Sequence, residues 1–430
     1  MRARTLALIA LLQALPAAAA GLTPLEQAGK KIFFDTNLST LRNQSCATCH
    51  GPAAGWSRPD SELNKRGTVY SGSFSDRFGN RRPPSVAYVS QSPVLSWDKE
   101  EEVFVGGAFW DGRATGKRLR STAAEQAQGP FLNPVEHGFA DAACVVSRVC
   151  AAPYGTELRA LHPDLCAAVL PADIDERCAT DGYTAPLTAA ERRKVDKAFD
   201  AIALAVAAYE SSTEVNPFTA KFDAWQQGKA RLSKQERLGL ELFNGKAKCA
   251  ECHLSEGKKP LFTDFTYDNL GVPRNPDNPF YTMQANNPAG HAWIDPGLGG
   301  FLATEAAWRQ QARAEFGKHK VPTLRNADKR PSADFVKAFG HNGYFKSLKE
   351  IVHFYNTRDT LPVCAPGDAG ERVSCWPVPE TALNMNDDEL GDLGLTEAEE
   401  EAIVAFMQTL ATPASSRSLR VMGRWLSWPG

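Results

Sequence analysis

Two copies of the pentapeptide Cys-x-x-Cys-His stand out, Cys46-Ala-Thr-Cys49-His50 and Cys249-Ala-Glu-Cys252-His253. Two thiols at this spacing can form thioethers with the vinyl groups of one haem, while the adjacent histidine binds the iron. A single match could be a zinc half-site, but two matches behind similar helices favour covalent haem. The sequence therefore predicts two haem c groups, with His50 and His253 as proximal iron ligands.

The second axial ligand of the first iron is constrained because the chain has only eight histidines. The next histidine after His50 is His137, and the next methionine after Met1 is Met283. The segment that follows the first motif thus offers neither ligand, which predicts a five-coordinate haem open to peroxide or oxygen. The alternative is a ligand from farther along the chain, with His137 as the main candidate.

For the second iron, Tyr355 is the candidate second ligand. The preceding residues have helical spacing, with an apolar stripe formed by Leu348, Ile351, Val352 and Tyr355. His353 lies on the other side of this helix, so Tyr355 is better placed to point inward. A buried tyrosine bonded to the backbone would give the same pattern.

The amino terminus predicts export. Residues 1–20 combine a basic start at Arg2 and Arg4, a short apolar core and small residues up to Ala20, which is typical of a signal peptide cleaved near Ala20. No later apolar run is long enough to span a membrane. Haem c attachment then indicates the periplasm. The net charge of −2 predicts no nucleic-acid partner.

Each half of the chain repeats one plan: a capped helix, a haem motif, loops and a closing helix. The opening helices start at capping boxes, Thr23 and Ser233, and the closing helices start at Thr188 and Thr396 and run to about residues 209 and 410. The loops are rich in Pro and Gly. We therefore expect a mainly α fold of two cytochrome c-like domains, each around one covalent haem, with long loops and little sheet.

The expected domains are an N-terminal unit at 21–212 with the peroxidatic haem and a C-terminal unit at 213–412 with the electron-transfer haem. A tail follows at 413–430, and a cysteine-containing insert at about 141–184 is expected to be a surface elaboration. The cysteines outside the haem motifs are even in number, which predicts disulfides in an oxidising compartment. They are Cys144, Cys150, Cys166, Cys178, Cys364 and Cys375. Cys364 with Cys375 is the expected pair, and the other connectivities stay open.

Several segments beyond the haem motifs resemble the bacterial dihaem cytochrome c peroxidase and MauG family. They are Phe109-Trp110-Asp111-Gly112-Arg113, Gln126 to Glu136, Val321-Pro322-Thr323-Leu324-Arg325-Asn326 and His341-Asn342-Gly343. The resemblance covers nearly the whole mature chain in the family's order. It is specific for the family but not for the substrate.

The resemblance also separates two branches of this family. The helix after the His-Asn-Gly segment supplies a Met ligand in the ordinary peroxidases and a Tyr ligand in MauG, and here that place is Tyr355. The removable His that the ordinary peroxidases hold on their first haem is missing. Both differences point to the MauG-like branch. A phenolate ligand is expected to lower the haem potential, which favours storing an oxidising equivalent.

Three further roles are implied by the resemblance. Glu136 and Gln126 match the family's distal-pocket pair, with Glu136 moving the peroxide proton and Gln126 orienting peroxide. Trp110 matches the electron relay between the haems. By their residue types alone, Glu136 and Gln126 could be solvated polar residues and Trp110 an ordinary interface tryptophan.

A calcium ion between the haems is another feature of the family, bound by the Asn of an Arg-Asn-x-Pro segment. The matching stretch here is Arg81-Arg82-Pro83-Pro84, so Arg82 stands in the Asn place. Carbonyl ligands could remain, and Asn80 is adjacent, but a cation facing an arginine is unfavourable. Calcium is therefore doubtful.

The leading functional interpretation is a periplasmic enzyme that uses hydrogen peroxide to oxidise a protein substrate. The alternatives are a cytochrome c peroxidase that takes electrons from a small cytochrome or cupredoxin, and a dihaem electron carrier without enzymatic activity. MauG has a surface Trp just before its second haem motif, and this chain does not. Oxidation could leave instead through Trp225, Trp293 or Trp308.

Overall fold

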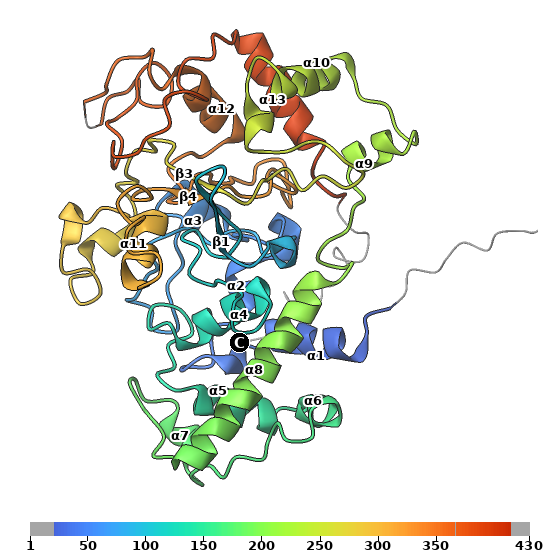
Figure 1. The fold of residues 1–430 in the computed structure, drawn as a ribbon, viewed down its shortest axis with the longest axis vertical. Helices are drawn as coiled ribbons and strands as arrows, with labels where there is room; N and C mark the ends of the chain where they lie inside the picture. Colours follow the sequence, from blue (N-terminus) through green and yellow to red (C-terminus); the bar gives the residue numbers. More distant parts are fainter. Residues whose placement is uncertain (1–20, 366, 414–430) are drawn as a thin grey trace, which may run out of the picture.

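The computed structural model describes residues 21–365 and 367–413, so the expected signal peptide and nearly all of the tail lie outside the described residues. In the N-terminal half, α8 is the longest helix and crosses α1 (Figure 1). The helices of this half are α1 Pro24–Phe33, η1 Thr36–Leu38, α2 Cys46–Cys49, η2 Pro52–Ala54, α3 Ser61–Lys65, η3 Val89–Gln91, α4 Thr122–Leu132, α5 Ala142–Ala151, α6 Gly155–Leu161, α7 Ile174–Arg177 and α8 Ala189–Ser211.

The C-terminal half contains a second opening helix, α10, which packs on a second closing helix, α13 (Figure 1). The helices of this half are α9 Lys221–Gln226, α10 Lys234–Asn244, η4 Cys249–Glu251, η5 Pro279–Thr282, η6 Gly290–Ala292, α11 Gly297–Thr304, α12 Leu348–Thr357 and α13 Glu397–Gln408. The predicted domain boundary falls in the connection between α8 and α9. The division into domains stays a prediction.

Regular β-structure is limited, within the described residues, to two antiparallel strand pairs. β1 (Ser96–Asp98) pairs with β2 (Val103–Val105), and β3 (Tyr267–Asp268) pairs with β4 (His319–Lys320). In the second pair, Asp268 lies opposite His319. The expected fold class, mainly α with long loops and little sheet, is confirmed.

Side-chain caps start the helices where the sequence predicts. Thr23, Ser233 and Thr396 each form a full capping box with the Glu three residues later. Thr188 accepts a hydrogen bond from the Glu191 amide, but the Glu191 carboxylate accepts from the Val169 amide instead of closing the box. The closing helices end within two residues of the predicted positions.

Both helix pairs cross at a glycine. A Cβ atom on Gly29 of α1 would lie 1.8 Å from the Ala205 carbonyl oxygen of α8, and one on Gly239 of α10 would lie 1.8 Å from the Ala402 carbonyl oxygen of α13. Only glycine allows backbones to approach this closely. Buried apolar residues surround each crossing: Ile32, Phe33, Ile202 and Val206 in the first half, and Leu242, Phe243, Ile403 and Phe406 in the second.

The segment expected as a surface elaboration contributes to the N-terminal core. Helix α5 packs on α8 and buries Val145, Val146 and Val149. Asp141 caps α5 and forms an ion pair with Arg192 of α8 at 2.5 Å. The expectation was wrong because spacing between cysteines reveals cross-links but not which face of the intervening helix is buried.

The predicted disulfides are present. Within the described residues the six cysteines outside the motifs pair as Cys144–Cys178, Cys150–Cys166 and Cys364–Cys375, and the four motif cysteines remain free. The Cys364–Cys375 pair was expected. The other two cross-link the segment around α5, α6 and α7, and their pairing was left open by the sequence.

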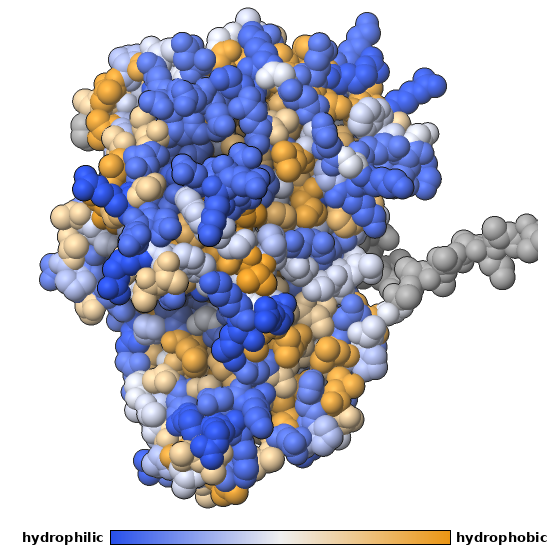
Figure 2. Space-filling model, viewed as in Figure 1, coloured by the Kyte–Doolittle hydropathy of each residue, from blue (hydrophilic) through white to orange (hydrophobic). Residues whose placement is uncertain are grey.

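None of the described helices combines the length and apolar character needed to cross a bilayer. Figure 2 shows polar and charged side chains over much of one face, with apolar residues in smaller groups between them.

The glycine crossing gives a stability prediction. We expect Gly29→Ala to destabilise the protein by about 1–3 kcal/mol, because the new methyl group must push α1 away from the Ala205 carbonyl. Chemical denaturation of the haem-loaded protein measures the effect. Gly79→Ala is the control, since its nearest neighbouring atom would be 3.8 Å away. Equal stability of Gly29→Ala and the wild type would contradict the prediction.

Candidate functional site

The N-terminal motif forms a short helix, α2, with His50 directly after it. The amide of His50 donates to the Cys46 carbonyl, which holds the ring beside the two thiols. Burial lowers the pKa of His50 to about 4. The imidazole is therefore neutral at physiological pH, which is the form that binds iron.

The C-terminal motif has the same arrangement around His253. Its amide bonds to the Cys249 carbonyl, and its Nδ1 lies 2.8 Å from the Phe262 carbonyl oxygen. Nδ1 thus donates to a carbonyl, which leaves Nε2 unprotonated and available as a ligand. Burial lowers the pKa of His253 as well.

A large cavity extends from the N-terminal half to the C-terminal motif. Its wall includes Arg58 and Pro84 at one end and Cys249, His253 and Tyr355 at the other. Tyr355 and His253 therefore line one cavity. Burial raises the pKa of Tyr355 well above its usual value, so a phenolate there requires a positive charge such as a metal ion.

Helix α12 carries Tyr355 and is tied to α13 by hydrogen bonds. Ser347 caps α12, and Val352 and Phe354 are buried in the core. The Asn356 side chain donates to Glu400 of α13 at 2.7 Å. These contacts fix the rotation of α12, and with it the direction of Tyr355.

His353 is held away from the cavity. Its Nδ1 lies 2.9 Å from the Glu400 carboxylate, and its Nε2 lies 3.1 Å from the Val373 carbonyl oxygen. Both ring nitrogens thus have partners outside the cavity. This agrees with the helical-face argument that placed Tyr355 inward.

Near the N-terminal motif, the structure brings Glu136 close to the two cysteines. Burial raises the pKa of the Cys49 thiol, and the Glu136 carboxylate raises it further. Burial raises the pKa of Glu136 itself, although a 2.9 Å hydrogen bond from Asn133 partly offsets this. Gln126 is half-buried on α4, and its side chain has no hydrogen bond within the described residues.

His137, the alternative ligand of the first iron, is buried with its Nδ1 2.6 Å from the Leu38 carbonyl oxygen. Its ring packs edge-on against Phe131. Burial lowers its pKa to about 4. One nitrogen is therefore committed to the backbone, and the five-coordinate state of the first haem stays a prediction.

Trp110 lies in the wall of the cavity with only 7% of its surface exposed. Its indole N–H donates to the Arg82 carbonyl oxygen at 2.9 Å, and its own carbonyl accepts from the Lys320 amide at 2.9 Å. The ring is thus held by Arg82 of the first half, and the backbone of Trp110 is held by Lys320 of the second half. That position suits a group between the two motifs.

The Arg82 guanidinium faces the Trp110 ring, 5.0 Å from its centre, and also donates to the Gly340 carbonyl. A fixed positive charge therefore stands where the resemblance places a calcium ligand. That calcium binding is unfavourable at this place stays a prediction.

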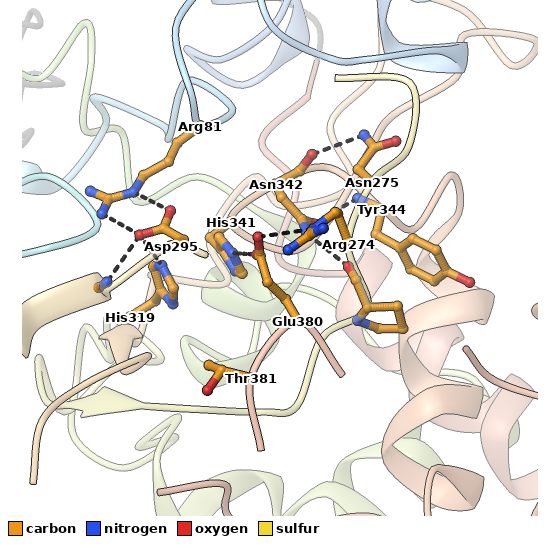
Figure 3. A network of polar contacts seen from close by, with 12 residues as sticks. Arg81, Arg274, Asn275, Asp295, His319, His341, Asn342, Tyr344, Glu380 and Thr381 are labelled. Atoms are coloured by element: carbon orange, nitrogen blue, oxygen red, sulfur yellow. Dashed lines mark hydrogen bonds and ion pairs between the residues drawn. The ribbon is translucent and has the colours of Figure 1, made fainter. Parts of the chain in front are cut away.

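A buried polar network joins the two halves, with Arg81 facing Asp295 (Figure 3). Arg81 donates to both oxygens of Asp295 at 2.6 and 2.7 Å, and it also donates to Asp111, the neighbour of Trp110, at 2.6 Å. The His319 ring stacks on His341 with 3.6 Å between the ring centres. Because Arg81 already occupies the Asp295 carboxylate, the cluster is an ion-pair network rather than a cation site.

The surroundings of Arg58 indicate whether the cavity can hold haem. This arginine is 1% exposed, lines the cavity, and has Nε and Nη1 without hydrogen-bond partners. Burial lowers its pKa to about 9. A buried unpaired guanidinium is costly, and an anionic propionate would satisfy it. Together with the free thiols of Cys249 and Cys252 and the adjacent His253, the cavity fits haem c.

Sequence reasoning missed Arg58, Arg81 and Asp295. Arg81 and Asp295 pair across 214 residues of chain, and Arg58 is distinguished by its burial, so spacing gave no signal. The scarcity of histidine could have drawn attention to His319 and His341, two of the eight histidines, which both line the cavity.

Comparisons with known proteins agree with this geometry. A family model described as di-haem cytochrome c peroxidase matches residues 24–231. The methylamine utilization protein MauG of Paracoccus denitrificans is 31% identical over 388 residues, covering 89% of this chain and 87% of MauG. The cytochrome-c peroxidase IdrP1 of Denitromonas iodatirespirans is 27% identical and covers 89% of this chain and 80% of its own length.

Among solved structures, the diheme peroxidase BthA from Burkholderia thailandensis superposes with a TM-score of 0.70 at 29% identity. The match covers 92% of this chain and 88% of BthA. The similarity therefore extends over both halves.

The contact between α12 and α13 gives a pH prediction. The hydrogen bond to Glu400 raises the pKa of His353 above its unfolded value, so the charged histidine stabilises the fold below about pH 6.5. This contribution is lost as the pH rises through the folded-state pKa. We expect His353→Gln to cost about 1 kcal/mol at pH 5.5 and less at pH 8.5, measured by denaturant unfolding.

The matched control is His162→Gln, since His162 has no ion pair within the described residues. A cost of His353→Gln that is independent of pH would contradict the role of the ion pair.

Proposed function

The chain belongs to the dihaem cytochrome c peroxidase and MauG family, and we propose that it is a periplasmic member that oxidises a protein substrate. As a member of this family, it is a peroxide-using dihaem oxidoreductase. The proposal adds that peroxide reacts at the N-terminal haem and that oxidising equivalents are shared with a His/Tyr-ligated C-terminal haem.

One observation carries the proposal: Tyr355 and His253 line the same cavity, on elements that are far apart in the chain. His253 and Tyr355 would both hold the iron of the C-terminal haem. A phenolate is a hard anionic ligand, so it favours oxidised iron over reduced iron. This supports the storage of an oxidising equivalent rather than rapid electron uptake from a small donor.

The haems supply the redox chemistry, and the chain's residues hold them and manage protons. Cys46 and Cys49 hold the first haem with His50, and Cys249 and Cys252 hold the second with His253. Arg58 would pair with a propionate, since its guanidinium is buried and lacks a partner.

Glu136 is the proposed proton carrier at the first haem. Cleavage of the peroxide O–O bond needs a group that takes the proton from one oxygen and returns it to the other. Burial raises the pKa of Glu136, which suits both steps, and Asn133 fixes one oxygen of its carboxylate. Gln126 would orient the peroxide by hydrogen bonding.

Trp110 is the proposed electron relay between the haems. Its hydrogen bonds to residues of both halves support a fixed position in the shared cavity wall. An indole that does not reorient keeps the distance to both haems constant, which suits electron transfer.

Of the three tryptophans considered as exits toward a protein substrate, Trp225 has the best-supported route. Phe262, whose carbonyl contacts His253, packs on Phe222 with 5.2 Å between ring centres, and Phe222 packs on Trp225 at 5.4 Å. A continuous packed path thus joins the second haem motif to Trp225.

Addition of peroxide to the fully oxidised protein tests the function. A long-lived oxidised spectrum that decays on adding the protein substrate supports the proposal. Rapid turnover that needs a small donor protein and prior half-reduction supports peroxide removal instead, the activity named for several relatives. An absent response would indicate an electron carrier.

The Tyr355 ligand yields a prediction. We expect Tyr355→Met to raise the midpoint potential of the C-terminal haem and to shorten the lifetime of the oxidised state, because a neutral thioether stabilises oxidised iron less than a phenolate does. Spectroelectrochemistry and stopped-flow spectroscopy measure the two effects.

Tyr344→Phe is the control, since Tyr344 is buried but its hydroxyl donates to Glu371 and does not line the cavity. An unchanged potential in Tyr355→Met would remove Tyr355 from the iron.

Glu136 yields a second prediction. We expect Glu136→Gln to leave both haem spectra unchanged and to slow the reaction with peroxide by about 100-fold or more, because an amide cannot carry the proton. Stopped-flow mixing with peroxide measures the rate. Glu157→Gln, at an exposed ion pair with Lys31 in the same half, is the control. A wild-type rate in Glu136→Gln would exclude the proton role.

A further inference from the structure

The two glycine crossings align the two halves residue by residue. Gly29 meets the Ala205 carbonyl and the Tyr209 Cβ, and Gly239 meets the Ala402 carbonyl and the Phe406 Cβ. Tyr209 therefore corresponds to Phe406. The next residue of each closing helix corresponds as well, which pairs Glu210 with Met407.

These two corresponding residues occupy equivalent places beside the haem motifs. Met407 lines the cavity that contains Cys249 and His253. Glu210 lies close enough to Cys46 that, after burial, its charge is the largest influence on the pKa of that thiol. The N-terminal pocket thus has a carboxyl group where the C-terminal pocket has a thioether.

The Glu210 carboxyl is buried without a partner. The residue is 2% exposed, its Oε2 has no hydrogen-bond partner, and no described donor reaches its side chain. Burial raises the pKa of Glu210 to about 8. A buried carboxyl without a cation is expensive to ionise, so its protonation state responds to any change of charge nearby.

Among the residues that the structure describes, no cation pairs with the Glu210 carboxyl. Lys30 on α1 is bonded to Glu214, and the Tyr209 hydroxyl also donates to Glu214. The Glu210 charge raises the pKa of two neighbouring groups, Cys46 and Tyr209. The ionisable groups beside those two are Glu136 near Cys46, and Glu214 with its partner Lys30 near Tyr209.

We propose that Glu210 is a proton-binding group of the N-terminal haem pocket, which takes up a proton when that haem is reduced and releases it when the haem is oxidised. When an electron from a donor enters the haem, one positive charge is lost from the iron. The Glu210 carboxylate then binds one proton from solvent, forming an O–H bond at one oxygen. The two changes leave the net charge of the pocket unchanged, which lowers the cost of reduction in a medium of low dielectric constant.

The inference concerns only the haem held by Cys46 and Cys49 and is independent of the substrate proposed above. Met407 cannot bind a proton, so the same coupling is expected to be absent at the corresponding place of the C-terminal haem. The coupling would therefore distinguish the two haems.

A redox titration that resolves the two haems, repeated from pH 6 to pH 9.5, tests the proposal. In the wild type we expect the potential of the N-terminal haem to fall as the pH rises, by about 59 mV for each tenfold difference in proton affinity between its two oxidation states. In Glu210→Gln the fall over this range is lost. The potential then stays near the value that the wild type reaches at low pH.

Reduced-minus-oxidised infrared spectra provide a second measurement. The wild type is expected to show a protonated carboxyl band that Glu210→Gln removes. Glu210→Met, which copies the residue of the other half, keeps the pocket filled should the amide disturb folding. It is expected to lose the pH dependence as well.

Two controls separate this effect from a general change in charge or packing. Glu214→Gln removes an exposed carboxylate just after the end of α8. Met407→Leu changes the corresponding residue of the C-terminal half. Neither is expected to change the pH dependence of the N-terminal haem. The proposal is overturned if Glu210→Gln and Glu210→Met both retain the wild-type slope, or if the carboxyl band persists in both variants.

Discussion

The close crossing of an opening helix and a closing helix is the contact on which each half depends. At Gly29 and Gly239 the backbones approach so closely that no side chain fits between them. This contact fixes the haem motif, which follows the opening helix, relative to the last turn of the closing helix. The residues that reach each haem from that turn are therefore determined by the crossing, and they differ between the halves as Glu210 and Met407.

Local sequence signals predicted much of this architecture. Capping residues located the starts of the long helices, because a cap acts within three residues of its own position. The haem motifs are equally local, since thiols and histidine lie within five consecutive residues. The direction of Tyr355 also followed from helical periodicity, and the structure shows how Asn356 and His353 hold that direction through Glu400.

Features that depend on distant partners could not be predicted in this way. The importance of Arg58 follows only from its burial without a partner, and that of Arg81 only from its contacts with Asp111 and Asp295. The segment around α5 was misjudged for the same reason, since its cysteines are visible in the sequence while its packing on α8 is not. The correspondence of Glu210 with Met407 likewise depends on the two helix crossings, which bring together residues that are distant in the chain.

The Arg81 bridge bears on how independent the halves are. A repeated plan suggests two modules that could be separated or exchanged, as in a chain built by duplication. Yet Arg81 belongs to the first half, and its carboxylate partner Asp295 lies buried in the second. If one half were expressed alone, it would keep one charge of this pair without its partner, on the surface that normally contacts the other half. The two halves therefore share one plan but depend on each other for the neutralisation of a buried charge.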